Sequence, residues 1–276
     1  MSKILILGAS GQDGSFACEQ LVKAGHDVFG AVRKASTTNL SNLKLLTFGS
    51  KKRFNLERFD LQDESSIYRL ISAIQPEFIF NFADQDHVSW SHSLPIYSCD
   101  VTSRSVNIIL EAIKLINPNI CLIQPISSNI FGNSEDQYIS ESTIIDPLSP
   151  YSIAKATALY ICRYYRSVYN LKIVNPILFN HESERRTTEY VSRKISMAAA
   201  NIKLKRQEVL YLGDISGQID WGYAPEFVKY MTMLAFEGHY GEYIIGTGTL
   251  TSVREFAENC FNFLDLDFDR YVEIDQ

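Results

Sequence analysis

The chain begins with Lys3-Ile4-Leu5-Ile6-Leu7-Gly8-Ala9-Ser10-Gly11-Gln12-Asp13-Gly14, an apolar run followed at once by three closely spaced glycines. A dinucleotide pyrophosphate needs this order of strand, glycine turn and helix, because its phosphates bind at the helix N-terminus. Gly8 permits the tight turn, Gly11 lets the backbone approach the phosphates, and Gly14 lets the helix pack closely on the strand. The stretch therefore predicts a nicotinamide dinucleotide site. A turn without a ligand is the alternative, and the preceding strand favours the cofactor.

The composition excludes several classes of protein. Hydrophobic residues make up 46% of the 276 residues, charged residues make up 21%, and the net charge is −6. A negative chain argues against sequence-independent binding of nucleic acid, which requires a basic face. No apolar run has the length of a membrane span, no signal peptide precedes the first strand, and the five cysteines lack metal-ligand spacing. We therefore expect a cytoplasmic protein with reduced thiols and with neither a metal, a membrane nor a nucleic acid as partner.

Short apolar segments alternate with segments of helical period through the first two thirds of the chain. Helices are expected at Ser65–Ile74 and Val101–Ile116. Alternation of this kind predicts an α/β fold with a doubly wound parallel sheet, the Rossmann arrangement, in which ligands bind beyond the carboxyl ends of the strands. The expected strands are Lys3–Leu7, Asp27–Val32, Phe54–Phe59, Phe78–Phe82, Ile120–Ile126 and Leu171–Leu178.

After about Asn180 the alternation loosens. We expect residues 1–180 to form an NADP-binding Rossmann domain, and residues 181–276 to form a smaller substrate-binding lobe that is interleaved with it. The elements expected in the later part are helices near Tyr190–Lys203, Pro225–Phe236 and Ser252–Phe263, and strands at Val209–Leu212 and Tyr243–Ile245.

The end of the second expected strand carries cations where an NAD enzyme carries an acid. In a Rossmann unit that binds NAD, an acidic residue after this strand holds the ribose 2′-hydroxyl. Here Asp27 lies at the wrong end of the strand, and Val32 is followed by Arg33-Lys34-Ala35-Ser36. Two cations and a hydroxyl suit the 2′-phosphate of NADP. NADP is therefore predicted over NAD, with a solvated strand end as the alternative.

Tyr151 and Lys155 lie four residues apart at the expected start of a helix. Residues at this spacing share one helical face, so the ammonium favours the phenolate and lowers the phenol pKa from about 10. Such a tyrosine can exchange a proton with a sugar hydroxyl while hydride moves to nicotinamide. The hydroxyl of Ser127, at the end of the fifth expected strand, is predicted to hold the substrate oxygen beside Tyr151.

These elements together resemble the extended short-chain dehydrogenase/reductase family, and within it the GDP-mannose 4,6-dehydratases, which modify nucleotide sugars. The resemblance begins with the glycine-rich stretch and spans nearly the whole chain. Its most specific part is Phe179-Asn180-His181-Glu182-Ser183-Glu184-Arg185-Arg186. It continues in Asp86-His87-Val88, Asp146-Pro147-Leu148-Ser149-Pro150-Tyr151, Asp220-Trp221-Gly222-Tyr223-Ala224 and Ser252-Val253-Arg254-Glu255-Phe256.

The resemblance implies a fixed order of chemistry. Hydride leaves sugar C4 for NADP, a base removes the C5 proton, the C6 hydroxyl departs as water, and hydride returns to C6. By the same resemblance Tyr151 is the C4 base, and Lys155 supports both Tyr151 and the nicotinamide ribose. Arg185 and Arg186 lie in a loop that reaches a neighbouring subunit's cofactor in such enzymes, so a homo-oligomer, a tetramer, is expected.

The candidate site residues fall into three groups, and no metal ligand is among them. The catalytic residues are Ser127, Tyr151 and Lys155, with Asn129 at the family's glutamate position. The substrate-binding residues are Ser128, Asn180 and Lys194. The cofactor-binding residues are Gly8, Gly11, Gln12, Asp13, Gly14, Arg33, Lys34, Ser36, Asp60, Leu61, Tyr151, Lys155, His181, Arg185 and Arg186.

Two positions depart from the family's pattern. After the paired hydroxyls the dehydratases carry a glutamate that serves as acid and base for C5 and C6, and this chain has Asn129. An amide cannot accept that proton, and losing a general acid or base costs about 10²–10⁴-fold in rate. The family's arginine before Asp-Trp-Gly, a diphosphate ligand, is Ile219 here, and the chain ends at Gln276 where relatives continue. The C4 machinery is thus intact, whereas the C5 and C6 machinery is not.

Three hypotheses follow from this asymmetry. The first is a GDP-mannose-4,6-dehydratase-like enzyme that acts on a nucleotide-activated sugar, expected to be GDP-linked, by NADP-linked hydride transfer at C4. The second is an NADP-dependent C4 oxidoreductase, either a 4-keto-sugar reductase or a 4-dehydrogenase. The third, of another class, is a non-catalytic NADP-binding paralogue. Asn129 and Ile219 favour the third hypothesis, whereas the intact Ser127, Tyr151 and Lys155 argue against it.

Overall fold

The computed structural model describes residues 1–33, 40–44, 46, 53–136 and 138–275. The chain forms two compact units, Met1–Leu178 with Pro225–Ile245 and Phe179–Ala224 with Gly246–Gln276. The boundary expected from the sequence, at residue 180, lies close to Leu178, where the chain first passes from the first unit into the second. Residues 225–245, which the sequence division places in the later lobe, return to the first unit because they complete its large sheet.

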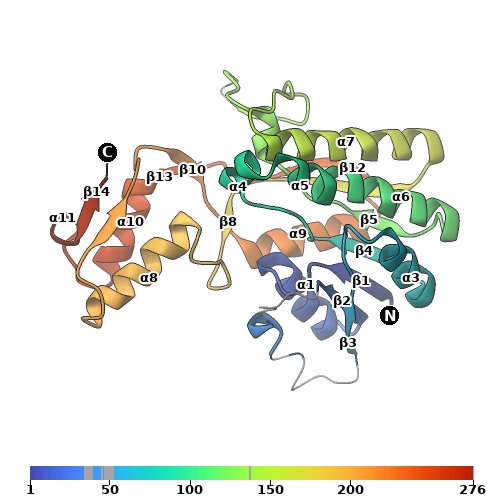
Figure 1. Ribbon diagram of the computed structural model, residues 1–276, viewed down its shortest axis with the longest axis horizontal. Helices are drawn as coiled ribbons and strands as arrows, with labels where there is room; N and C mark the ends of the chain where they lie inside the picture. The colour runs from blue at the N-terminus through green and yellow to red at the C-terminus, as the bar shows by residue number, and fades with distance from the viewer. Residues whose placement is uncertain (34–39, 45, 47–52, 137, 276) are drawn as a thin grey trace. The chain divides into compact units, whose positions relative to one another are not determined.

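The first unit is built on a sheet in which every pairing is parallel (Figure 1). Its strands lie in the order β12-β7-β5-β4-β1-β2-β3, and the short β6 pairs with β7. The order reverses between β1 and β4, and ligands of such sheets bind beyond the carboxyl ends of the strands at this point. The strands are β1 (Lys3–Leu7), β2 (Asp27–Val32), β3 (Phe54–Arg58), β4 (Phe78–Asn81), β5 (Cys121–Ile123), β6 (Ile126–Ser127), β7 (Lys172–Leu178) and β12 (Gly241–Ile245).

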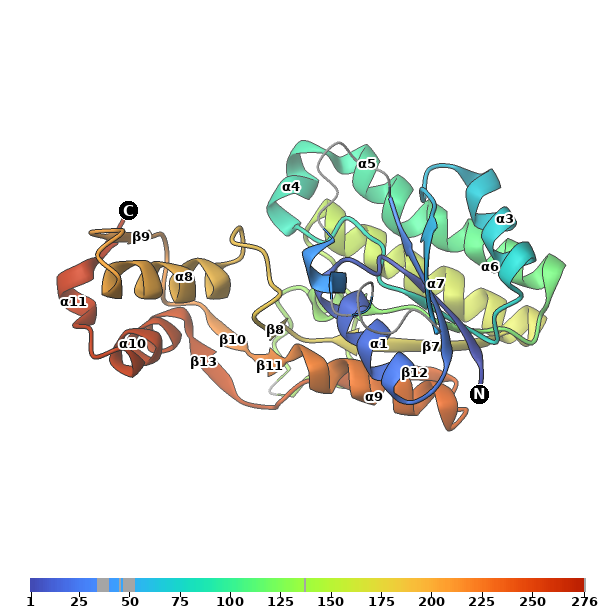
Figure 2. The same cartoon turned by 90° about the horizontal axis from the view of Figure 1, so that it is seen from below.

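Helices cover both faces of this sheet (Figures 1 and 2). One face carries α1 (Gln12–Lys23) and α9 (Ala224–Phe236), and the other carries α3 (Glu64–Ile74), α6 (Ser105–Ile116) and α7 (Pro150–Tyr169). A strand covered on both sides is apolar throughout rather than at alternate positions, and residues 4–7 of β1 are at most 2% exposed. The predicted α/β fold with a doubly wound parallel sheet is therefore confirmed.

Two predicted elements differ in detail from the observed ones. The single strand expected at Ile120–Ile126 is broken into β5 and β6 around Pro125, because proline has no N–H to donate to a ladder. The helix expected from Val101 begins instead with a π-helical turn, η2 (Asp100–Arg104). The hydroxyls of Ser103, in this turn, and of Ser105, the first residue of α6, donate to the carbonyls four residues earlier, a contact that bends helices.

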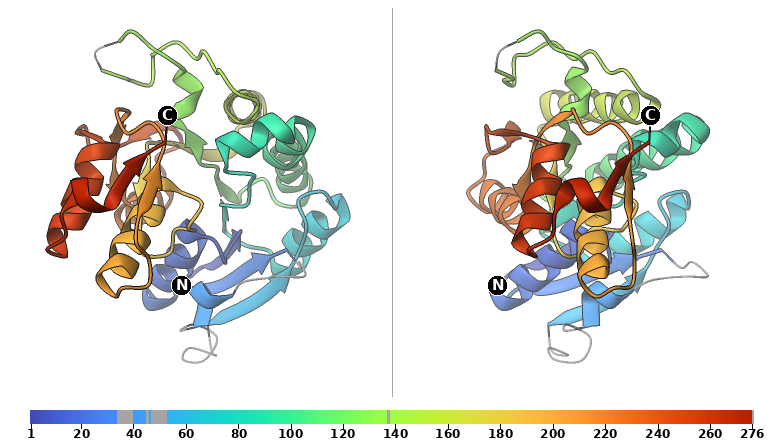
Figure 3. Two further views of the ribbon diagram at one scale, coloured as in Figure 1. Left: turned by 60° about the vertical axis from the view of Figure 1, so that its left-hand side comes forward. Right: turned by 90° about the vertical axis from the view of Figure 1, so that its left-hand side faces the viewer.

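The second unit is smaller and mixes helices with short strand pairs; its later half is orange to red in Figure 3. Helix α8 (Val191–Lys203) packs against α10 (Val253–Phe263), and Ile195, Ala199 and Phe261 lie in the shared core. The strands pair as β8 (His181–Glu182) with β11 (Gly222–Tyr223), β9 (Leu210–Leu212) with β14 (Val272–Ile274), and β10 (Gln218–Asp220) with β13 (Leu250–Ser252).

The remaining described segments are short. They include α4 (Val88–Ser93), α5 (Pro95–Cys99), α11 (Phe268–Tyr271) and the 3₁₀ segments η1 (Ser41–Leu43) and η3 (Ser128–Phe131). None of the helices in the described ranges combines the length and the apolar composition that crossing a bilayer requires.

Candidate active site

The glycine turn fits a dinucleotide pyrophosphate. Gly8 follows β1 with a φ of +78°, and a Cβ at Gly14 would lie 2.3 Å from the Gly8 carbonyl oxygen. Gly11 is the N-cap of α1 and has no side chain that could cap the helix. The turn therefore holds a helix N-terminus and closely packed backbone at the carboxyl end of β1, in a cradle that side chains would fill.

The other residues assigned to the cofactor lie at neighbouring strand ends. Gln12 and Asp13 form the first turn of α1, where the Gln12 amide donates to the Asp13 carboxylate at 3.3 Å. Asp60 and Leu61 follow β3, and the Asp60 carboxylate accepts the Gln62 N–H at 3.0 Å. All four positions lie at the carboxyl edge of the sheet, where the sequence places the dinucleotide.

Arg33 follows β2 directly and is exposed. Its guanidinium donates to the hydroxyl of Tyr97 on α5 at 2.7 Å. Lys34 and Ser36, the other two residues predicted to hold the 2′-phosphate, lie outside the described residues. The structure thus places one cation of the predicted pair at the strand end.

Local sequence fixes the start of the helix that carries Tyr151 and Lys155. The Ser149 hydroxyl accepts the Ser152 N–H at 3.1 Å, and the Ser152 hydroxyl accepts the Ser149 N–H at 2.9 Å. This reciprocal capping box begins α7, and Pro150 occupies the first helical position, where a missing N–H costs nothing. Tyr151 therefore falls in the first turn, with Lys155 one turn later.

The structure brings the three predicted catalytic side chains together. Ser127, at the end of β6, is close enough to the Tyr151 hydroxyl to lower the pKa of the phenol. The Lys155 ammonium lies 5.8 Å from the centre of the Tyr151 ring. Tyr151 and Lys155 are 7% and 6% exposed, so their charges act in an environment that water screens little.

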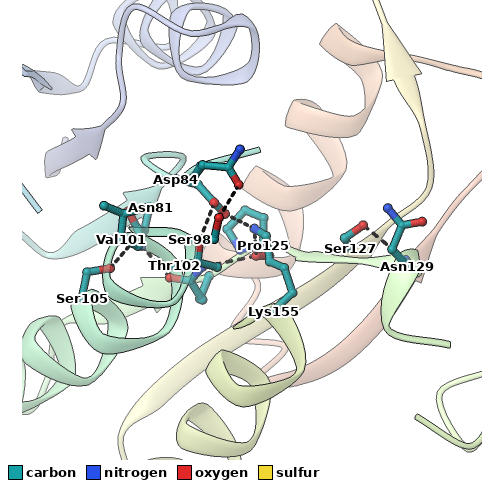
Figure 4. A network of polar contacts seen from close by, with 12 residues as sticks. Asn81, Asp84, Ser98, Val101, Thr102, Ser105, Pro125, Ser127, Asn129 and Lys155 are labelled. Carbon is teal, nitrogen blue, oxygen red and sulfur yellow. Dashed lines mark hydrogen bonds and ion pairs between the residues drawn. The ribbon is translucent and has the colours of Figure 1, made fainter. Parts of the chain in front are cut away.

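A carboxylate that sequence reasoning missed completes the cluster. The Asp84 carboxylate forms an ion pair with the Lys155 ammonium and accepts the Thr102 hydroxyl at 2.8 Å (Figure 4). The same ammonium donates to the Pro125 carbonyl at 3.1 Å. Asp84 lies just after β4, and its position beyond the carboxyl end of an inner parallel strand is the one signal that points to it.

Burial is the largest single influence on the pKa values of Tyr151, Lys155 and Asp84. Burial raises the pKa of Tyr151 above its usual value, because desolvation disfavours the phenolate. Lys155 lowers that pKa, as the sequence predicts, but its effect is the smaller one. Burial also lowers the pKa of Lys155, whereas Asp84 raises it with a net upward shift, so Lys155 remains an ammonium. Burial raises the pKa of Asp84 against the opposing effect of Lys155.

The family's glutamate position lies beside this cluster. Asn129 follows Ser127 and Ser128 in η3, its side chain is exposed, and its N–H donates to the Ser127 hydroxyl at 3.3 Å. Asp136, the nearby acid whose contacts are described, accepts the Thr143 hydroxyl at 2.9 Å instead. The position next to the Ser127 hydroxyl thus presents a neutral amide.

The second unit holds the specific Asn-His-Glu-Ser segment. His181 lies in β8, and its ring nitrogen Nδ1 lies 2.8 Å from the Phe179 carbonyl. The Asn180 carbonyl accepts the Gly222 N–H at 2.8 Å. Lys194 on α8 donates to the Tyr211 carbonyl at 2.6 Å. These contacts order the segment within its own unit.

The two arginines of this segment are held locally as well. Arg186 lies 3.6 Å above the Tyr190 ring and forms an ion pair with Glu182 at 3.3 Å. The Arg185 N–H donates to the Ser183 hydroxyl at 3.1 Å. Ile219, at the position of the family's arginine, lies in β10 and packs against the core of the second unit.

In the described part of the chain, no group of three or more His, Cys, Asp or Glu side chains is placed to hold a metal ion. All five cysteines are free thiols, and burial raises the pKa of both Cys121 and Cys162 to about 12, which keeps them protonated.

Comparison with known sequences identifies relatives over nearly the whole chain. A profile of the family described as GDP-mannose 4,6 dehydratase matches residues 5–275. The GDP-mannose 4,6 dehydratase of Drosophila melanogaster is 37% identical over 267 residues, which cover 95% of this chain and 68% of the relative. The GDP-mannose 4,6-dehydratase of Sinorhizobium fredii (strain HH103) is 37% identical over 262 residues, covering 93% and 75%. GDP-mannose 4,6 dehydratase 1 of Arabidopsis thaliana is 35% identical over 280 residues, covering 99% and 77%.

Solved structures show the same fold at lower identity. DesIV, a dTDP-glucose 4,6-dehydratase from Streptomyces venezuelae with NAD and TYD bound, gives a TM-score of 0.86 at 19% identity, with 99% of this chain and 85% of that chain covered. A UDP-glucose 4-epimerase from Thermotoga maritima with UDP-glucose gives 0.85 at 21% identity, with 99% and 86% covered.

Proposed function

The chain belongs to the GDP-mannose 4,6-dehydratase family, and from this premise we propose that it transfers hydride at C4 of a GDP-linked sugar, with NADP as its cofactor. It is an enzyme of the extended short-chain dehydrogenase class that uses a nicotinamide cofactor and acts on nucleotide sugars. The observation that carries the proposal is the cluster of Ser127 with the buried Tyr151 and Lys155, which lies at the same sheet edge as the glycine turn.

The residues of this cluster divide the work at C4. The nicotinamide ring, when bound, accepts a hydride and can return it. Tyr151 takes the proton of the C4 hydroxyl, and the hydroxyl of the neighbouring Ser127 holds the same sugar oxygen in place. Because burial raises the pKa of Tyr151, the phenolate depends on the Lys155 ammonium beside it. With a nicotinamide to accept or donate the hydride, these three side chains supply the proton transfer and the positioning that oxidation or reduction at C4 requires.

Loss of water needs a further group. A base must remove the C5 proton, and an acid must protonate the departing C6 hydroxyl. The family resemblance assigns both tasks to the position of Asn129, whose amide is neutral and cannot accept a proton. This single residue favours a second candidate, an oxidoreductase that acts at C4 without dehydration.

NADP is proposed over NAD on the strength of the cations after β2. Arg33 is held at that strand end by the Tyr97 hydroxyl at 2.7 Å. A guanidinium can bind a phosphate with two parallel hydrogen bonds, which a ribose hydroxyl cannot match. The preference therefore depends on the charge of Arg33.

Arg33→Gln is expected to weaken the binding of NADPH by about tenfold or more and to leave the binding of NADH nearly unchanged, since hydrogen bonds to charged groups contribute about 1.5–3 kcal/mol. Titration of protein fluorescence with each dinucleotide measures both affinities. Tyr97→Phe is the matched control, because it removes the hydroxyl partner and keeps the guanidinium. Equal losses for NADPH and NADH in Arg33→Gln would contradict the 2′-phosphate assignment.

The reaction itself is tested by incubating the purified protein and NADP with GDP-mannose, while product mass and the absorbance of reduced nicotinamide are followed together. Dehydration gives a product lighter by one water with no net change in cofactor. A C4 dehydrogenase gives net reduction of NADP with no loss of water, and a 4-keto-6-deoxy sugar nucleotide with NADPH tests the reverse direction.

Tyr151→Phe is expected to lower turnover at least about 10²-fold while cofactor binding is retained. Binding of NADP without turnover of either sugar refutes the proposal.

Asn129→Glu is expected to raise formation of the 4-keto-6-deoxy product from GDP-mannose by about 10²-fold or more, because it supplies the missing acid and base. Asn129→Gln is the matched control, since glutamine has the length of glutamate but no titratable group. Mass spectrometry of the products measures both variants. An Asn129→Glu enzyme that forms no more dehydrated product than wild type would show that this residue does not limit dehydration.

We also propose a homo-oligomer, and the family resemblance makes a tetramer the expected form. Helix α7 supports an oligomer because Ile153, Tyr160, Tyr164 and Val168, spaced along one helical face, are 48–55% exposed. Light scattering of the purified protein is expected to give a multiple of the chain mass. Tyr164→Asp should shift the mass downward, whereas Tyr138→Asp, on an exposed loop, should not. A monomer at micromolar concentration would refute this proposal.

A further inference from the structure

Asp84 joins α7, the helix that carries Tyr151 and Lys155, to η2, and it has no part in the steps derived above. It follows β4, and its side chain is 9% exposed. One carboxylate oxygen pairs with the Lys155 ammonium, and the other accepts the hydroxyl of Thr102, on η2, at 2.8 Å (Figure 4). Both oxygens are therefore engaged, and the carboxylate is fixed from two sides.

From this geometry we propose that Asp84 is a positioning residue for proton transfer at Tyr151, because it holds the Lys155 ammonium in place and adds its own negative charge beside the phenol. The inference rests on the proposed function, because it concerns the residue that exchanges a proton with the sugar. Asp84 itself needs no contact with sugar or cofactor for this role.

The hydrogen bonds of Lys155 show how Asp84 positions it. An ammonium has three donors, and within the described residues Asp84 and the Pro125 carbonyl take two of them. The third donor is left for the ribose of the cofactor or for the Tyr151 oxygen. A lysine side chain has four rotatable bonds, and the two acceptors hold its end at one place, 5.8 Å from the centre of the phenol ring.

The charge of Asp84 also acts on the phenol. The groups that face Tyr151 are Lys155 on its own helix, Asp84 and Asp86 on the loop after β4, and Ser127 at the end of β6. Of these, Lys155 and Ser127 lower the pKa of the phenol, whereas the two carboxylates raise it. Asp84 thus keeps Lys155 charged and in place, and it offsets part of the effect of that charge on Tyr151. Its net effect is to move the proton transfer to higher pH.

A purely structural role is the competing explanation. A buried ion pair could serve only to join the loop after β4 to α7, and breaking it would then cost stability without changing the chemistry. The two explanations differ in one measurable quantity. A structural pair lowers the rate equally at every pH, whereas a positioning residue moves the pH at which the rate rises.

The test is the pH profile of kcat/KM for C4 oxidation by Asp84→Asn. The asparagine carbonyl can still accept from Lys155, so position is largely kept while the negative charge is removed. The acid limb of the profile is expected to move to lower pH by on the order of one unit, the effect of one nearby charge. A profile that keeps its midpoint while the rate falls, or one that moves to higher pH, would overturn the proposal.

Two further variants control for folding. Ser98→Ala removes a buried hydrogen bond to Gln85 at 3.1 Å in the same network, without touching Asp84, and should leave the profile in place. Thr102→Val keeps both charges and removes only the hydroxyl that holds Asp84. Because the carboxylate is then protonated more readily, we expect a smaller shift in the same direction. If Asp84→Asn fails to fold, an unshifted profile of folded Thr102→Val overturns the proposal.

A direct titration separates this inference from the proposed function. The ultraviolet absorbance of tyrosinate is recorded against pH with NADP present. Subtracting the curve of Tyr151→Phe from that of wild type isolates the titration of Tyr151. Subtracting the curve of Asp84→Asn/Tyr151→Phe from that of Asp84→Asn isolates the same titration without the charge of Asp84. The phenol should titrate at lower pH without Asp84, by the shift seen in the kinetics. If no sugar is turned over and the phenol still shifts, the proposed function fails and the role of Asp84 stands. An unshifted phenol overturns that role even in an active enzyme.

Discussion

The structure of the first unit depends on one constraint, the common direction of all strands in its sheet. Parallel strands need crossover connections rather than tight hairpins, so all strands of the sheet end at the same edge. Gly8 follows β1, Asp84 follows β4 and Ser127 ends β6, yet all three come to the same edge for this reason. The site is therefore assembled by topology from residues that are far apart in the sequence.

The same constraint explains why most of the fold could be predicted from sequence. Buried parallel strands are continuous apolar runs, and the first two, Lys3–Leu7 and Asp27–Val32, have the predicted bounds. The capping box at Ser149 places Tyr151 and Lys155 on α7 by local hydrogen bonds alone. Such features are determined by a few neighbouring residues, whose propensity, capping and periodicity all favour the same structure.

What sequence could not provide arises from contacts between distant segments. The pairing of Asp84 with Lys155 joins residues from β4 and α7, and a lone aspartate after a strand does not reveal its partner. The π-helical turn of η2 is invisible to a search for period 3.6. The return of residues 225–245 to the first unit also depends on tertiary contacts, because the local sequences of α9 and β12 do not reveal which unit they join.

The position of β12 bears on the order in which the chain acquires its structure during synthesis. Glu242 on β12 binds both Arg163 and Arg166 on α7, the helix that carries Tyr151 and Lys155. Between these partners lies the first segment of the second unit, residues 179–224, so the ion pairs close a very long loop. During translation the helix of the active site is thus complete long before its last anchor leaves the ribosome. The chain must hold α7 on an unfinished sheet edge until then, and this interval exposes β7 to pairing with other chains.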